Sequence, residues 1–303
     1  MLTDATLTAI VPVYNRPTVV LEALDSIAAQ ATPPDRLVVV DDGSDDGTVA
    51  NVRRWLEEHG ERCGGELIEV DHGGAPRAIN AGVERAGDCQ VMGILDSDDL
   101  WPPDYVQAMK RAMAEDADAV AATCDKVSIS YPGERREMVR LDSIPSDATE
   151  WIFRHGATGQ SNTVFRVETV RAIGGFNPET RTGSDLDLML RLSVHGRWRH
   201  VPGPVVTYRD GYARHKGEAG PLSHQYPDRR LRRVRAMETT LFESGVAEAI
   251  DDAVWRPKLG AMWFKAGKQL AKAGDKARAR DCFAEAVRYA PGHLRARLRH
   301  WFG

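Results

Sequence analysis

Three aspartates within four positions follow a short apolar segment in the first third of the chain. Residues 91–101 read VMGILDSDDLW, so Asp96, Asp98 and Asp99 come directly after what reads as a buried strand. Their charges repel one another, and a bound cation would relieve that repulsion. Oxygen-rich sites suit Mg²⁺ or Mn²⁺, which usually also hold a substrate's phosphates. One such residue is enough for a turn, so three favour a metal-dependent phosphate site.

The elements that must position these acids alternate between strands and helices. Apolar segments at 7–13, 37–40 and 66–70 predict strands, and helical periodicity covers 19–30, 49–59 and 75–86. This alternation predicts an α/β fold with a parallel sheet and helices on both faces. Ligands of such sheets bind at the carboxyl ends of the strands. A second acidic pair, Asp41 and Asp42, follows the second strand, and we expect both acidic clusters to line one crevice.

The order of these segments resembles glycosyltransferase family 2. IVPVYNRP, VVVDDGSDDGT and LDSDDLW are similar to that family's nucleotide-sugar domain, and SNTVFRVETVRAIGGFNPETRTGSDLDLMLRLS is similar to its acceptor-side block. The resemblance covers about residues 5–212. It implies the GT-A fold, which is Rossmann-like with a mostly parallel sheet flanked by helices. It also implies inverting transfer of a sugar from a nucleoside-diphosphate sugar, here expected to be a UDP-sugar, with Mn²⁺ or Mg²⁺ as cofactor.

The resemblance assigns the donor site residue by residue. A carboxylate is suited to reading uracil because it accepts a hydrogen bond from the ring N–H. Asp98 matches the metal ligand, Asp96 matches the ribose and metal-shell position, and Ser97 lies between them. The positions that match the base-binding residues are Pro12, Val13, Tyr14, Arg16, Asp41 and Asp42. A turn followed by a helix cap is the alternative role for the Asp41–Asp42 pair.

Two positions depart from the family pattern. Relatives often carry Arg where this chain has Ile79, and Arg77 either reaches the base and diphosphate or lies on the helix surface. Relatives also often carry a metal- or diphosphate-binding His where this chain has Gly211. We expect His215 to complete the metal site, with Arg209 as the alternative. The polar run 209–223 predicts a loop that closes over the donor.

The general base of the family matches Asp185. Ser184 stands where the family usually shows an acid, and Ser184 with Asp187 predicts a capping box at the start of a helix. Asp187 is therefore expected to be structural. The alternative for Asp185 is a surface acid favoured by the helix dipole.

Composition divides the chain into a catalytic domain, 1–225, and a helical region, 226–303. The second part has 17 basic and 9 acidic residues, a net charge of +8, whereas the first part has 23 and 35, a net charge of −12. No apolar run is long enough to span a bilayer, and no secretion signal is visible. Four scattered cysteines read as reduced thiols. These features predict a cytoplasmic enzyme, with contact to the inner face of the membrane as an alternative.

The C-terminal region resembles a single tetratricopeptide repeat. The matching positions are Trp263, Gly267, Leu270, Gly274, Ala279, Phe283, Ala286 and Pro291. One repeat cannot form an independent stack. We therefore expect a helical hairpin packed on the catalytic domain or, in a homodimer, on a second subunit. The alternative is docking of a partner or an anionic lipid by the arginines between 229 and 235. No motif indicates nucleic-acid binding.

Other functions remain open from sequence alone. A polyprenyl-phosphate glycosyltransferase would act at a membrane surface, and a non-catalytic interaction protein would use the helical tail. A sugar nucleotidyltransferase would need a Gly-rich, Lys-containing first loop, and YNRP stands there instead. The acceptor can be a glycan, a lipid-linked sugar or a small molecule.

Overall fold

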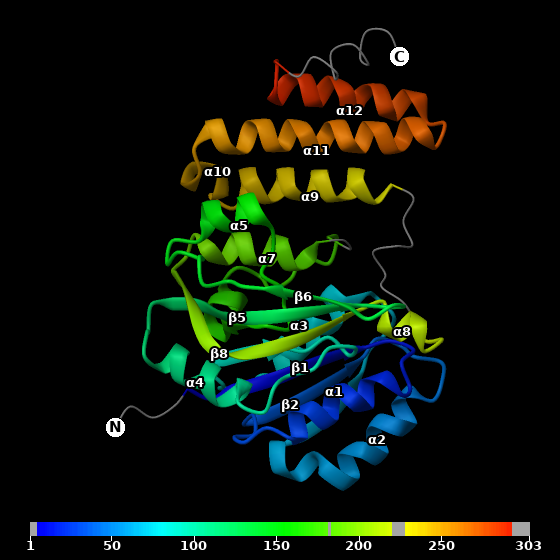
Figure 1. Cartoon of the computed structure of the whole chain (residues 1–303), viewed down its shortest axis with the longest axis vertical. Helices are drawn as coiled ribbons and strands as arrows, with labels where there is room; N and C mark the ends of the chain where they lie inside the picture. The colour runs from blue at the N-terminus through cyan, green and yellow to red at the C-terminus, as the bar shows by residue number, and fades with distance from the viewer. Residues whose placement is uncertain (1–4, 181–182, 220–227, 293–303) are drawn as a thin grey trace.

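The computed structural model describes residues 5–180, 183–219 and 228–292, and it shows one mixed sheet with helices on both faces (Figure 1). The strands lie in the order β3-β2-β1-β4-β7-β5-β6, and β8 pairs with β5. They are β1 (Leu7–Val13), β2 (Arg36–Asp41), β3 (Gly65–Glu69), β4 (Val91–Ile94), β5 (Ala119–Ser130), β6 (Arg135–Val139), β7 (Thr163–Arg166) and β8 (Arg197–Asp210). The α/β fold predicted from the alternating pattern is confirmed.

Each face of the sheet has its own core. In β1, Ile10 packs into the core on one face, while Ala9 and Val11 pack into the core on the other, as the two-residue period of a strand requires. The second of these cores includes α1 (Val19–Ala28), α2 (Thr48–His59) and α4 (Tyr105–Ala114). The first includes α3 (Ala75–Arg85), α5 (Thr149–His155), α6 (Val167–Ala172) and α7 (Ser184–Ser193).

The strand directions bring the predicted site residues to one edge. β3, β2, β1 and β4 are parallel neighbours, so the carboxyl ends of β1, β2 and β4 lie together. β7 then runs antiparallel to both β4 and β5. This reversal has no counterpart in the sequence pattern. It places the residues just before Thr163 beside the end of β4, close to Asp96.

The C-terminal helices form a stack on the outer side of α7 (Figure 1). Its members are α9 (Arg229–Glu243), α10 (Val246–Ala249), α11 (Asp252–Lys272) and α12 (Lys276–Tyr289). One continuous core runs from the sheet through α7 to α12. The helices α11 and α12 meet closely at Gly267, where an added Cβ would lie 2.6 Å from Cε1 of Phe283. The predicted boundary at 225/226 lies outside the described residues.

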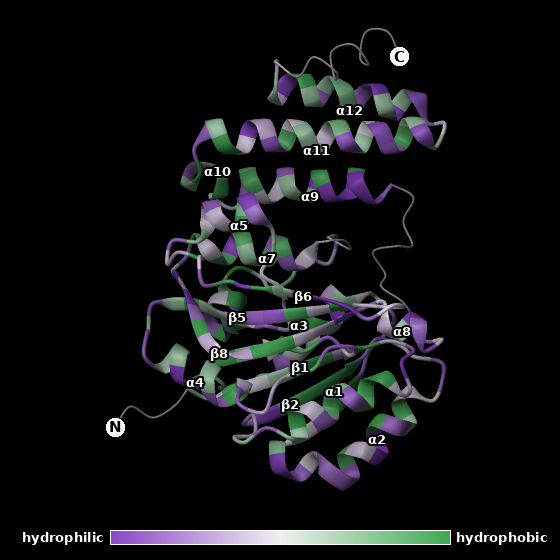
Figure 2. Ribbon diagram, viewed as in Figure 1, coloured by the Kyte–Doolittle hydropathy of each residue, from purple (hydrophilic) through white to green (hydrophobic). Residues whose placement is uncertain are grey.

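Polar and apolar residues alternate along the tail helices (Figure 2). None of the helices within 5–180, 183–219 and 228–292 is both long enough and apolar enough to cross a bilayer. Most apolar residues of α9 face inward instead: Val234 and Leu241 are fully buried, whereas Phe242 is exposed. The tail therefore covers part of the catalytic domain with its own hydrophobic face.

Removal of the tail is expected to cause aggregation. A chain ending at residue 219 would lose α9, and the apolar side of α7 that α9 covers would be exposed to water. Light scattering and size-exclusion chromatography of the truncated chain would measure this. A monodisperse 1–219 chain with the unfolding midpoint of the full chain would contradict the prediction.

Candidate active site

A cleft of about 410 Å³ opens at the carboxyl ends of β1 and β4. Of the predicted site residues, eight line it: Pro12, Val13, Tyr14, Arg16, Asp42, Asp96, Ser97 and Asp98. The sequence did not indicate several others that line it, among them Ala75, Ser128 and Tyr208. The two acidic clusters thus meet in one cleft, with Asp42 as the member from the second strand.

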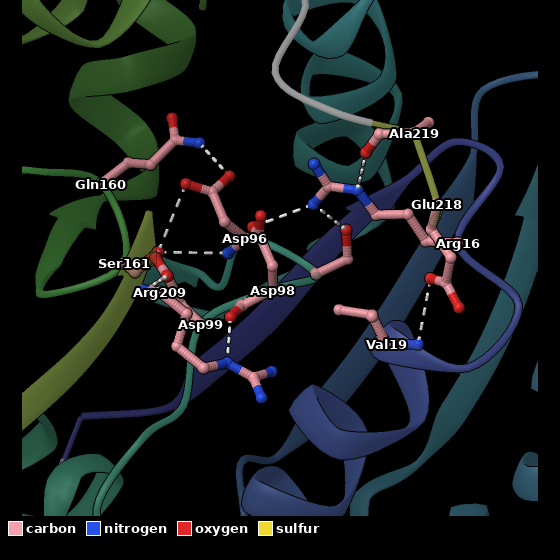
Figure 3. Close-up of polar contacts among 11 residues, drawn as sticks. Arg16, Val19, Asp96, Asp98, Asp99, Gln160, Ser161, Arg209, Glu218 and Ala219 are labelled. Atoms are coloured by element: carbon pink, nitrogen blue, oxygen red, sulfur yellow. Dashed lines mark hydrogen bonds and ion pairs between the residues drawn. The ribbon is translucent and has the colours of Figure 1, made fainter. Parts of the chain in front are cut away.

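Arg16 holds the predicted metal ligand (Figure 3). Its Nη1 lies 2.9 Å from Oδ1 of Asp98 and donates to Oγ of Ser97 at 3.0 Å. Its Nε donates to the carbonyl of Ala219 at 3.1 Å. Both ionic side chains are mostly buried. The guanidinium is therefore the counter-charge that Asp98 uses in this structure.

Asp96 is held from the opposite side by residues that precede β7. Nε2 of Gln160 donates a hydrogen bond to Oδ1 of Asp96 at 2.5 Å. The backbone N–H of Asp96 donates one to Oγ of Ser161 at 3.2 Å. Burial, and then the neighbouring charge of Asp98, raise the pKa of Asp96 to about 6. Asp96 and Asp98 thus repel each other in the absence of an additional cation.

Asp99 has a structural role within the cleft wall. It accepts hydrogen bonds from Oγ of Ser161 at 2.7 Å and from the backbone N–H of Arg209 at 2.9 Å. Burial, followed by the charges of Asp96 and Asp98, raises its pKa well above the usual range. Asp99 therefore fastens the start of the loop after β4 to β8.

Arg209 presents an unsatisfied group in the same cleft. The side chain is 5% exposed, donates through Nε to the carbonyl of Asp98 and pairs through Nη1 with Glu22. The guanidinium also lies 4.1 Å from the ring centre of Tyr212. Its buried Nη2 has no hydrogen-bond partner in the described part of the chain. The rest of the guanidinium is held in the wall of the cleft by Asp98, Glu22 and Tyr212.

The two residues of the acidic pair at the end of β2, Asp41 and Asp42, lie in different surroundings. Asp42 accepts hydrogen bonds from the backbone N–H groups of Gly73 and Gly74, at 2.8 and 2.9 Å, and so fixes the turn that starts α3. Gly74 has φ +90, which a side chain would strain. Asp41 is buried and does not line the cleft, but its Oδ1 has no partner among the described residues.

His72 was missed by sequence reasoning. Its ring stacks on Tyr14 with 4.3 Å between centres, and its Nδ1 lies 3.0 Å from Oδ2 of Asp42. A lone His in a loop carries no sequence signal. In the structure, Tyr14 and His72 form an aromatic pair at the rim of the cleft.

Arg77 and His215, two of the predicted residues that do not line the cleft, lie on the surface. Arg77 is exposed on the first turn of α3, where its side chain packs over Gly73. His215 is exposed on α8 (Tyr212–His215), and its ring faces Tyr131 at 5.6 Å rather than the acids. Neither contacts Asp96 or Asp98, so the structure offers no support for their assigned roles.

The predicted closing loop is partly regular structure. Residues 209–219 comprise the end of β8, α8 and a short segment bound to the first strand's end. Glu218 accepts a hydrogen bond from the backbone N–H of Thr18 at 3.1 Å. It also accepts one from the backbone N–H of Val19, at the start of α1, at 3.2 Å (Figure 3). The expectation of a loop is wrong for the residues that form the end of β8 and α8, and 220–223 lie outside the described residues.

The Gly-Gly-Phe turn positions α7 on the sheet. Asn80 of α3 accepts from the backbone N–H of Phe176 and donates to its carbonyl, both at 2.8 Å. Gly175 has φ +70, and an added Cβ would lie 2.6 Å from Oδ1 of Asn80. Only glycine fits here, so the turn is held tightly against α3 and directs the chain towards α7.

The two acids of α7 face different surroundings. Asp185 is half-buried and close enough to Asp96 to contribute to raising its pKa, after burial and Asp98. Asp187 is buried and pairs with Arg191, whose Nη2 lies 2.7 Å from Oδ2, while Thr240 of α9 donates to Oδ1 at 2.6 Å. Only Asp185 is directed towards the acidic cleft.

The predicted capping box does not form. Gly183, in the left-handed conformation with φ 81, is the N-cap of α7, and no side chain caps the helix. Asp187 is structural, as expected, but as the partner of Arg191 and Thr240. The Ser-x-x-Asp pattern was misleading because Asp187 instead pairs with Arg191 of the same helix and with Thr240 of the tail.

Lys126 is a further residue that sequence reasoning missed. Its Nζ donates to the carbonyl of Thr158 at 2.7 Å and lies 4.3 Å from the ring centre of Tyr208. Burial lowers its pKa, and the charges of Asp99 and Asp185 act in the opposite direction. Lys126 thus places a positive charge close to both Asp99 and Asp185.

The donor set fits a hard divalent cation shared with a ligand. Within the described residues, no three acidic, His or Cys side chains surround one point. Mg²⁺ usually takes only one or two protein carboxylates and completes its shell with phosphates and water. The mutual repulsion of Asp96 and Asp98 and the unpaired Nη2 of Arg209 are consistent with such a shared site.

Comparison with known proteins identifies the family. Residues 8–173, more than half of the chain, match the model of "Glycosyl transferase family 2". The chain is 25% identical over 194 residues to chondroitin synthase of Pasteurella multocida. The aligned residues cover 63% of this chain and 19% of that protein. This chain thus spans about a fifth of that relative's length.

Two solved structures share the fold. S. aureus TarS 1-349 in complex with UDP-GlcNAc has a TM-score of 0.67 at 15% identity, covering 97% of this chain and 85% of that one. The mannosyltransferase PcManGT of Pyrobaculum calidifontis, with GDP-Man and Mn²⁺, has a TM-score of 0.59 at 22% identity, covering 99% and 85%. At these identities the likeness concerns the fold. The family match, however, extends from β1 through β7 to α6 and includes both acidic clusters, and the chain belongs to glycosyltransferase family 2.

Proposed function

We propose that the protein transfers a sugar from a nucleoside-diphosphate sugar to an acceptor hydroxyl, with inversion at the anomeric carbon. The observation that supports this proposal is the meeting of Asp96, Asp98 and Arg209 in one cleft, with Asp185 of α7 close enough to act on the pKa of Asp96. UDP is the nucleotide we favour. Asp42, which lines the cleft near the Tyr14–His72 pair, is the candidate reader of its base, whereas Asp41 does not line the cleft.

The diphosphate would lie against Arg209 and the acidic pair. Arg209 and Arg16 both line the cleft, and their guanidinium groups are the candidates to bond the phosphate oxygens. A divalent cation held by Asp98, with Asp96 nearby, would neutralise charge on the leaving diphosphate. In that state Arg16 would give up its contact with Asp98 and remain available to the phosphates.

Asp185 is the proposed general base. It would accept the proton of the acceptor hydroxyl while that oxygen attacks the anomeric carbon and the bond to the diphosphate breaks. A single displacement inverts the centre once and needs no covalent enzyme intermediate. Asp187 cannot substitute, because both of its oxygens are already engaged by Arg191 and Thr240 in a buried site.

Donor binding and its dependence on metal test the proposal. UDP-, GDP- and dTDP-sugars with Mn²⁺ would be compared by thermal shift, and one nucleotide is expected to stabilise the protein selectively. At a ligand concentration of 100 Kd the gain is about 2.7 kcal/mol. Excess EDTA and Asp98→Asn are each expected to remove most of it. Equal UDP binding in Mn²⁺ and in EDTA would contradict the metal assignment, and the anomeric configuration of the product, by NMR, would test inversion.

A further inference from the structure

A second cleft of about 560 Å³ lies between α7 and the helical tail. Four segments enclose it: the end of α5, the start of α7, and facing stretches of α9 and α11. Among the described residues that line it, six are basic and none is acidic. The basic ones are His155, Arg229, Arg230, Arg233, Lys258 and Lys265. We refer to it as the basic cleft.

Within the described residues, few acidic side chains balance the positive charge of the basic cleft. In the described part of the chain, no ion pair involves Arg229, Arg230, Arg233 or Lys265. The nearby acid Asp228 pairs instead with Arg232 and Arg278, which do not line the cleft. An exposed run of arginines is usually a solvated face, but here three of them converge with lysines of another helix.

The pKa of Lys258 reflects the same excess of positive charge. Its Nζ donates to the carbonyls of Phe153 and Arg154 at the end of α5, so the side chain is fixed in place. Burial, and then the charges of Arg233, Lys265 and Arg154, lower its pKa to about 8. A protonated Lys258 is therefore disfavoured by its neighbours, and an anion in the cleft would remove that penalty.

The basic cleft adjoins the candidate base. Gly183 and Leu186 line it, and these two residues flank Asp185 in the sequence. Asp185 also lies close enough to Asp96, which lines the donor cleft, to act on its pKa. A molecule held in the basic cleft would therefore lie near the start of α7, where Asp185 is found.

We propose that the basic cleft binds a phosphate group of the acceptor, so that the acceptor is a phosphate-bearing molecule. This proposal rests on the glycosyl transfer proposed above. Arginine and lysine together suit phosphate because guanidinium groups bind two of its oxygens at once and ammonium groups add charge. The apolar side chains of Leu186, Met237 and Met262 in the same cleft offer a surface for the rest of the acceptor.

A concave site favours a single anionic group over a membrane surface. Its basic residues come from α5, α9 and α11 and line one enclosed space. A bilayer is flat and would contact only side chains on an open face. Anionic vesicles are therefore included as the competing outcome of the test.

The test uses glycerol 3-phosphate as the probe and glycerol as the uncharged control ligand. Binding to the full chain would be measured by calorimetry with Mg²⁺ and UDP present. Arg233→Ala/Lys265→Ala is expected to weaken binding of glycerol 3-phosphate by about tenfold or more, since charge-assisted hydrogen bonds are lost. The matched control is Arg235→Ala/Lys268→Ala, which removes the same residue types from exposed positions of α9 and α11 that do not line the cleft. It is expected to bind within about twofold of the wild type.

Each contrary outcome has a distinct meaning. Displacement of glycerol 3-phosphate by UDP, or equal binding by both double variants, would overturn the proposal. Sedimentation with phosphatidylglycerol vesicles, lost in Arg233→Ala/Lys265→Ala, without binding of glycerol 3-phosphate would assign the cleft to a membrane instead. UDP binding, titrated separately in the same proteins, tests the proposed transferase function. Its absence in every protein would reject that function and leave the phosphate result readable.

Discussion

Asp185→Asn is expected to lower the rate of sugar transfer by about 10²- to 10⁴-fold, the usual loss when a general base is removed. The amide keeps the shape of the side chain but cannot take a proton at neutral pH. The residues that line the donor cleft are untouched, so donor and metal affinity should stay close to those of the wild type. Single-turnover rates with a saturating donor would measure the loss.

The matched control is the neighbouring acid of the same helix. Asp187→Asn removes an equal charge two residues away, yet Asp187 faces Arg191 and α9 rather than the cleft. Once corrected for the folded fraction, its turnover should remain within about tenfold of the wild type. Near-normal turnover in Asp185→Asn together with lost turnover in Asp187→Asn would show that the base has been assigned to the wrong acid.

Asp187→Ala is expected to destabilise the fold by about 3 to 5 kcal/mol, because it leaves a buried guanidinium without its carboxylate. Asp187 is 5% exposed, and the side chain of Arg191 is 13% exposed. Thr240 would also lose the acceptor of its hydrogen bond. The free energy of unfolding in urea would measure the effect.

A surface pair of the same spacing provides the comparison. Arg154 and Glu150 of α5 also form an i,i+4 ion pair, at 2.7 Å, but both side chains are nearly half exposed. Glu150→Ala should change the free energy of unfolding by less than about 1 kcal/mol. Equal losses in Glu150→Ala and Asp187→Ala would mean that the Asp187–Arg191 pair does not anchor α7.

The acids of the cleft were predictable because strand ends are local features of sequence. An apolar run followed by Asp96, Ser97 and Asp98 indicates both the strand and the place where its side chains leave the sheet. The register of the parallel pairs then brings the end of β1 beside the end of β4. The helices that flank these strands were also found within a residue or two of their observed ends.

The contacts that support those acids were not predictable in the same way. Gln160 and Ser161 reach Asp96 only because β7 enters the sheet antiparallel between β4 and β5. Periodicity in the sequence shows that a strand exists, but it does not show which strands it pairs with in the sheet. The Asp187–Thr240 bond joins residues 53 positions apart, and a helix-cap pattern in the sequence cannot reveal it. Arg77 and His215 were assigned by resemblance alone, and their surroundings in the structure are solvent-facing.

The bond between Thr240 and Asp187 has a consequence for recombination between family members. A chimaera that joins a foreign tail to this catalytic domain after residue 219 would leave Asp187 facing a foreign helix in place of α9. A crossover placed before Gly183 would carry α7, Asp187 and α9 together, and would bring the foreign Asp185 equivalent with them. The segment that must be exchanged together on this side of the molecule therefore begins at α7. An exchange that brings in a new tail also brings in a new candidate catalytic acid.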